Sequence, residues 1–102
     1  MTEREQAARA ELARLRRNID EIDEVLVKLL NQRARWALDV GQAKRGVELP
    51  IYEPERETEV MRHVLGTNRG PLSAEAIERL FERIIDESRS LQRHVIDGSV
   101  RP

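Results

Sequence analysis

Several polar side chains occupy positions where the surrounding pattern expects apolar ones. Arg33 interrupts an apolar heptad seam, and an unpaired buried guanidinium is strongly disfavoured. Arg33 therefore either meets an acidic side chain or binds an anion supplied from outside. Lys44 follows eleven positions later, which is close to three helical turns, so the two cations share one face about 16 Å apart along the axis. Long side chains from these two positions could bind one small molecule between them.

Glu57, Ser88 and Gln92 also interrupt apolar faces of the pattern. Arg16 lies seventeen residues before Arg33, or about 25 Å along a helix axis and roughly 100° around it. Within one straight helix the two arginines cannot touch the same small ligand, whereas antiparallel pairing of two such helices could bring Arg16 of one chain toward Arg33 of the other. Each residue also has a purely structural interpretation. Arg33 can set the register or form half of an ion pair, Ser88 can bond within its own helix, and Gln92 can be solvated.

A long helix is predicted from Glu11 to about Val47. Its apolar residues follow one another at alternating steps of three and four, and no proline or glycine precedes Gly41. The polar residues before Glu11 extend the helix, and we expect it to end near Arg45 or Gly46. The predicted seam contains Leu12, Leu15, Ile19, Ile22, Leu26, Leu29, Arg33, Trp36, Val40, Ala43 and Val47, with Trp36 interpreted as a core residue.

Two shorter helices are predicted after this one. Pro54 suits the first turn of a helix that ends at Leu65 or Gly66, with Glu53 as its cap. Ser73 is the expected N-cap of a third helix, from Ala74 to about Ile96. The inward face of this third helix is predicted to contain Ile77, Leu80, Phe81, Ile84, Leu91 and Val95.

Composition favours an all-helical protein that assembles with a second chain. The 102 residues form one domain (1–102, with a disordered tail from about 97), and 36% of them are charged while 3% are aromatic. The long helix would measure roughly 50 Å, about twice the width expected of such a domain, so we predict an obligate oligomer. A net charge of −1 disfavours nucleic-acid and membrane partners, and the absence of cysteine excludes a thiolate metal site or nucleophile. No secretory or membrane-spanning segment is apparent, which favours a cytoplasmic protein.

Taken together, these residues resemble the all-helical (type II) chorismate mutases. The opening of that family resembles the run from Leu15 to Asp23, with Arg33 ten residues later and then Val40-Gly41-Gln42-Ala43-Lys44. Its second-helix entry resembles the run from Pro50 to Glu57, and its third-helix signature resembles Ile84-Ile85-Asp86-Glu87-Ser88 with Gln92. The resemblance extends without a gap from about Leu12 to Gln92.

The resemblance implies three helices (long, short and medium) in an intertwined homodimer with two shared sites. It also implies rearrangement of chorismate to prephenate, without a cofactor or metal. By position, Arg33 and Arg16 from the partner chain should bind the substrate carboxylates. Lys44 and Gln92 should donate hydrogen bonds to the ether oxygen, where negative charge grows as the bond breaks. Glu57 and the backbone at Glu53 should hold the ring hydroxyl of the substrate. Ser88 and Arg56 should complete the polar lining of the site. Many family members have Asp at the position of Glu53, a departure that matters little if the contact is made by the backbone.

Other functions on the same fold stay open at this point. An isochorismate pyruvate-lyase or a mutase acting on an amino-substituted chorismate would use the same set of cationic side chains to bind its substrate. A non-catalytic helical module that binds another enzyme of the aromatic pathway is a further alternative, and association with such an enzyme is also compatible with an active mutase. The complete set of polar residues argues against a scaffold without activity.

Overall fold

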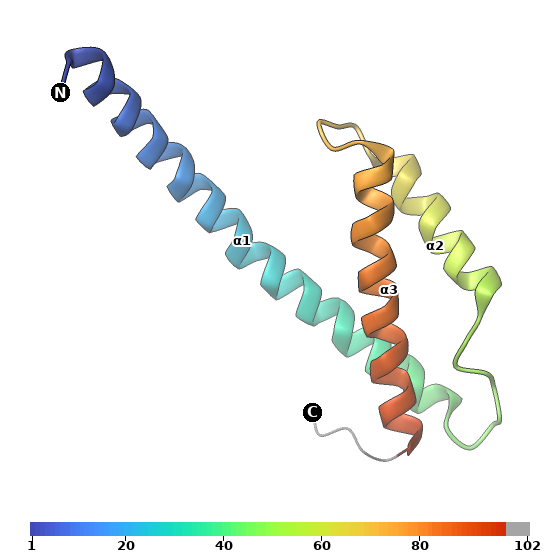
Figure 1. The fold of residues 1–102 in the computed structure, drawn as a ribbon. Helices are drawn as coiled ribbons and strands as arrows, with labels where there is room; N and C mark the ends of the chain where they lie inside the picture. Colours follow the sequence, from blue (N-terminus) through green and yellow to red (C-terminus); the bar gives the residue numbers. More distant parts are fainter. Residues whose placement is uncertain (98–102) are drawn as a thin grey trace. The chain divides into compact units, whose positions relative to one another are not determined.

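A computed structural model describes residues 1–97 of the chain, and these form three helices without a strand (Figure 1). Helix α1 runs over Glu3–Lys44, α2 over Pro54–Thr67 and α3 over Ala74–Asp97. The predicted order of a long, a short and a medium helix is confirmed. Helix α3 includes Asp97, which the sequence assigned to a disordered tail, and the rest of that tail lies outside the described residues. No helix in residues 1–97 is long and apolar enough to cross a membrane.

The chain divides into two units, residues 1–33 and residues 34–102, and each is described by itself. The first unit is almost entirely the N-terminal part of α1. Thr2 caps it, because its Oγ1 accepts a hydrogen bond from the backbone N–H of Glu5 at 3.1 Å. The apolar seam positions of this unit are all exposed, and they are Leu12, Leu15, Ile19, Ile22, Leu26 and Leu29.

The second unit places the end of α1 against α3. Ala37, Gly41 and Lys44 are the buried residues of α1, and a Cβ added at Gly41 would lie 3.2 Å from the Cα of Gln92. The prediction that Trp36 belongs to the core is wrong for the single chain, since Trp36 is 63% exposed. The buried stripe lies one position after the predicted seam because small residues, rather than large apolar ones, allow α3 to approach.

Helices α2 and α3 pack against each other in the same unit (Figure 1). Ser73 caps α3 as expected, with its Oγ accepting from the backbone N–H of Ala76 at 3.1 Å. The predicted side-chain cap of α2 is wrong, because Glu53 makes no capping hydrogen bond and its carboxylate pairs with Lys44 instead. The predicted inner face of α3 also needs correction, since Leu80 is exposed while Ile85 is buried.

Candidate functional site

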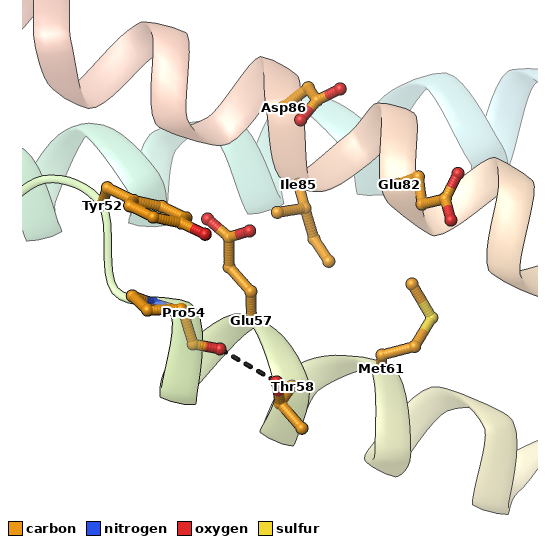
Figure 2. A pocket seen from close by; sticks show the side chains of 8 residues that line it. All are labelled: Tyr52, Pro54, Glu57, Thr58, Met61, Glu82, Ile85 and Asp86. Carbon is orange, nitrogen blue, oxygen red and sulfur yellow. Dashed lines mark hydrogen bonds between the residues drawn. The ribbon is translucent and has the colours of Figure 1, made fainter.

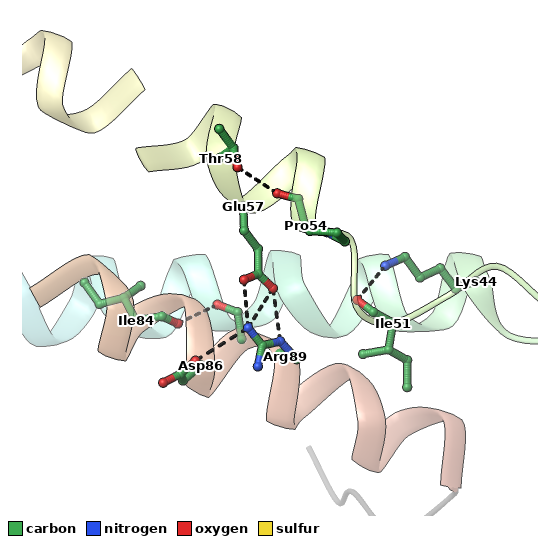
Figure 3. A network of polar contacts seen from close by, with 9 residues as sticks. Lys44, Ile51, Pro54, Glu57, Thr58, Ile84, Asp86 and Arg89 are labelled. Carbon is green, nitrogen blue, oxygen red and sulfur yellow. Dashed lines mark hydrogen bonds and ion pairs between the residues drawn. The ribbon is translucent and has the colours of Figure 1, made fainter. Parts of the chain in front are cut away.

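Lys44 is the one charged side chain that is buried within the described part of the chain, at 8% exposure. Its Nζ donates to Oε1 of Gln92 at 3.1 Å. It also donates to the carbonyl oxygen of Ile51 at 3.5 Å (Figure 3). The same Nζ lies 2.6 Å from Oε1 of Glu53, whose side chain is 45% exposed. An ammonium group has three hydrogens to donate, so each can be matched with one of these acceptors.

Close helix packing brings Lys44 and Gln92 together across 48 positions of the sequence. Gly41 lies one turn before Lys44 on α1, and its missing side chain lets the backbone of Gln92 and the Cβ of Val95 on α3 approach. Val95 is itself only 4% exposed and anchors the end of α3 in this contact. The sequence assigned Lys44 and Gln92 to one site, and their side chains are in direct contact.

A second polar cluster joins α2 to α3. The guanidinium of Arg89 donates from Nη2 to both carboxylate oxygens of Glu57 at 2.8 Å and from Nε to Oε2 at 3.0 Å (Figure 3). Both side chains are 27% exposed. The hydrogen bonds that Arg89 donates to Glu57 hold the pKa of Arg89 above its ordinary value, against the smaller opposing effect of burial. Glu57 was expected in the site, whereas Arg89 was missed. The inward-facing carboxylate of Glu57 was the signal that a cationic partner is needed.

An open groove lies beside this cluster, between α2 and α3. It encloses about 520 Å³, and Glu57 reaches into it between Tyr52 and Ile85 (Figure 2). Three carboxylates line it, so its charge disfavours an anionic ligand. Its lining residues are Tyr52, Pro54, Glu57, Thr58, Met61, Glu82, Ile85 and Asp86.

The other predicted site residues are Arg56 and Ser88 in the second unit and Arg16 and Arg33 in the first. Arg56 is exposed on α2, and the Oγ of Ser88, half-buried on α3, donates to the carbonyl oxygen of Ile84 at 3.0 Å. Arg16 is exposed and Arg33 is half-buried, both within residues 1–33. The structure thus brings Lys44, Gln92 and Glu53 together, while the two arginines are placed only within their own unit.

Comparison with known proteins places most of the helical region in one family. The family model described as chorismate mutase type II matches residues 15–93. A bifunctional chorismate mutase/prephenate dehydratase from Pseudomonas aeruginosa is 40% identical over 88 residues, which cover 81% of this chain and 24% of that protein. The chain thus spans about a quarter of the length of such bifunctional relatives.

Other relatives are matched over most of their length. A chorismate mutase from Methanocaldococcus jannaschii is 31% identical over 87 residues, covering 84% of this chain and 88% of that protein. The crystal structure of a chorismate mutase from Helicobacter pylori in complex with prephenate has a TM-score of 0.77 and 28% identity, covering 86% of this chain and 96% of that one. With the polar set on its helices and the match over residues 15–93, the chain belongs to the type II chorismate mutase family.

Proposed function

We propose that this chain converts chorismate to prephenate at a site built around Lys44 and Gln92. The observation that carries the proposal is the buried Lys44 Nζ, held 3.1 Å from the side-chain oxygen of Gln92. This pair places a cation and a neutral amide side by side at the end of α1, as the family reaction requires at an ether oxygen. The Helicobacter pylori relative, which was solved with prephenate, supports this product class for the fold.

The reaction requires the substrate to be held in its reactive conformer and the charge on its ether oxygen to be stabilised, and it requires no nucleophile. One carbon–oxygen bond breaks and one carbon–carbon bond forms within the same molecule, and negative charge grows on the ether oxygen. Because the carbonyl oxygen of Gln92 accepts from Lys44, the amide is oriented with its NH2 group left to donate. Donors aimed at that oxygen in advance stabilise the transition state more than the ground state.

Binding of the ether oxygen requires Lys44 to exchange one of its present partners. Three acceptors already lie near its three hydrogens. The Glu53 carboxylate is the partner that can leave, since its side chain is 45% exposed and can be solvated elsewhere. The Gln92 contact, which is less exposed, then stays in place and keeps the amide oriented.

The substrate carboxylates and hydroxyl are assigned to the other polar residues. Arg33 of one chain and Arg16 of the partner subunit hold the two carboxylates, which restricts the substrate to its reactive conformer. The ring hydroxyl contacts Glu57 and the backbone at Glu53. Ser88 and Arg56 complete the polar lining.

The same assignment requires a homodimer. The apolar seam of residues 1–33 is exposed along its length, and contiguous exposed apolar surface of this kind marks an interaction site. A second copy of the seam offers the matching heptad pattern. The dimer also supplies Arg16 to a site that its own helix cannot reach.

Loss of chorismate with identification of prephenate tests the proposal directly. We expect the purified chain to form prephenate from chorismate, and Lys44→Ala and Gln92→Ala to abolish most of this activity with the fold intact by circular dichroism. Lys28→Ala is the matched control, because it removes an exposed lysine from the same helix. Turnover of isochorismate with pyruvate release, and none of chorismate, would reassign the chain to lyase chemistry.

Association with another enzyme of the same pathway is a further part of the proposal. Relatives that fuse a chorismate mutase to a prephenate dehydratase support it, because the second activity consumes the product of the first. We expect kcat for chorismate loss to change when a separate prephenate dehydratase is added. An unchanged kcat at a saturating concentration of the added prephenate dehydratase would contradict this association.

A further inference from the structure

The Arg89–Glu57 pair joins the side chains of α3 and α2 through three hydrogen bonds, with donor–acceptor distances of 2.8, 2.8 and 3.0 Å. Two nitrogens of one guanidinium facing both oxygens of one carboxylate fix the plane of that carboxylate as well as its position. At 27% exposure on both sides, the pair is screened less by solvent than a surface ion pair. Glu57 is therefore held in one orientation.

Arg89 is itself held by two further groups. The centroid of the Tyr52 ring lies 5.1 Å from its Cζ, within range of a cation–π contact. Asp86, one turn earlier on α3, lies 3.6 Å from Nη2. Arg89 thus connects Glu57 with the loop that precedes α2, since Tyr52 is adjacent to Glu53 in the sequence.

We infer that Arg89 is a positioning residue, which acts on the reaction by orienting the Glu57 carboxylate toward the ring hydroxyl of the substrate. The inference rests on the proposed function, in which Glu57 accepts a hydrogen bond from that hydroxyl. A carboxylate oxygen has more than one lone pair, so Glu57 can accept from Arg89 and from the substrate together. The raised pKa of Arg89 keeps the guanidinium charged throughout the pH range of the reaction.

Removal of Arg89 should lower activity through Glu57 alone. We expect Arg89→Ala to reduce kcat/KM on the order of tenfold, below the ~100-fold that a 1 Å misplacement can cost. Arg89→Lys should recover part of this loss, because the charge returns without the fork geometry. In a Glu57→Gln background the further effect of Arg89→Ala should fall below about twofold, the signature of two residues that act as one unit.

The matched control is Arg83→Ala. Arg83 pairs with Glu87 at 2.8 Å on the exposed side of the same helix, so its loss removes an arginine–carboxylate pair without touching Glu57. We expect wild-type kcat/KM for this variant. Thermal unfolding of every variant, with assays run well below each midpoint, separates lost positioning from lost folding.

Each outcome of the double-mutant cycle decides the inference. Wild-type kcat/KM in Arg89→Ala, with Glu57→Gln impaired, would overturn the role of Arg89 and leave the proposed function standing. Equal fold losses on Arg89→Ala in both backgrounds would also overturn it, because Arg89 would then act independently of Glu57. A wild-type chain that forms no prephenate would instead remove the proposed function and this inference with it.

Discussion

The two side-chain partners of Lys44 differ in how far they are exposed to solvent. Gln92 is half-buried on α3 and accepts at 3.1 Å, whereas the Glu53 side chain lies 2.6 Å away but is 45% exposed. A partly exposed ion pair contributes about 0–1 kcal/mol, even where its distance is short. The Lys44–Gln92 contact is therefore the one that should govern catalysis.

Alanine substitutions at Lys44 and Glu53 should differ strongly in their effect on activity. We expect Lys44→Ala to lower kcat by about 100-fold or more, the usual effect of losing one transition-state donor. Glu53→Ala should change kcat/KM by no more than about fivefold, since it removes only a weak pair and leaves the backbone in place. Steady-state kinetics with chorismate measure both. Equal losses in the two variants would show that the Glu53 side chain, and not its backbone, takes part.

With Gln92 as a hydrogen-bond donor, we expect kcat to depend little on pH, and one substitution should change this. An amide does not titrate, and the pKa of Arg89 is raised by Glu57. The stabilisation from a raised pKa is fully present below the ordinary arginine value and is lost only as the pH rises through the raised one, so neither group alters activity between about pH 5 and 9. In Gln92→Glu the new carboxyl donates only while protonated, so kcat should rise as the pH falls toward about 4.3. A pH–rate profile of both proteins is the measurement, and a flat profile for Gln92→Glu would exclude donation from this position.

Sequence pattern could identify the charged residues of the site but not all of their partners. Gln92 stands out because it interrupts an apolar helix face, and Lys44 because it shares a face with Arg33. The structure brings Lys44 and Gln92 into contact. Arg89 could not be chosen in the same way, because an arginine on a polar helix is unremarkable until the carboxylate opposite it is known. Glu53 was expected to cap α2, but the buried Lys44 ammonium is a stronger partner for its carboxylate than a backbone N–H.

At the scale of elements, Gly41 controls how closely α1 and α3 approach. A Cβ at this position would lie 3.2 Å from the Cα of Gln92 and 3.3 Å from the Cβ of Val95. The first contact is with backbone, which moves less easily than the end of a side chain. The position of Gln92 relative to Lys44 therefore depends on the absence of a side chain at residue 41.

Gly66→Ala should stabilise the protein, whereas Gly41→Ala should lower its activity. Alanine gains roughly 0.5–1 kcal/mol over glycine inside a helix, and a Cβ at Gly66 meets nothing within 4 Å, so Gly66→Ala should stabilise the protein. At Gly41 the same gain is offset by the close contact with α3, and the displaced Gln92 should lower kcat by about tenfold or more. Chemical unfolding and chorismate kinetics on both variants test this. Full activity in Gly41→Ala would mean that α3 can shift without disturbing the site.

Helix positions were predictable from the sequence to within a few residues, but the buried face of the end of α1 was not. Large apolar residues define the heptad seam, and Trp36 and Val40 belong to it, yet both are exposed in the single chain. The contact within the chain instead uses Ala37, Gly41 and Lys44. Hydrophobic periodicity reports the larger apolar surface, and here that surface is not the one that α3 covers.

At the scale of the molecule, the N-terminal part of α1 has an apolar seam without cover from its own unit. Leu15, Ile22 and Leu29 are 42%, 59% and 60% exposed. Burial of apolar surface contributes about 25 cal/mol per Å², and helices draw most of their stability from packing an apolar face. A second copy of the chain offers such a face, which is the physical basis for the predicted homodimer.

Mixing two inactive variants should restore activity if the site is shared between chains. If the proposed homodimer is right, Arg16→Ala and Arg33→Ala each remove one of the two proposed carboxylate-binding arginines from every site, so each should be nearly inactive. After unfolding and refolding together, about half of the dimers are mixed, and each mixed dimer has one site with both arginines, giving roughly a quarter of wild-type activity. The measurement is prephenate formation by the refolded mixture.

The control mixture pairs Arg16→Ala with the double variant Arg16→Ala/Arg33→Ala, in which no combination of chains restores a complete site. Light scattering on each sample establishes whether dimers have formed. Recovery in the first mixture and none in the second would locate Arg16 in the site of the other chain. If dimers form and neither mixture recovers, both arginines must act within one chain. The exposed seam would then serve assembly alone, because a shared site requires that a mixed dimer combine Arg33 of one chain with Arg16 of the other.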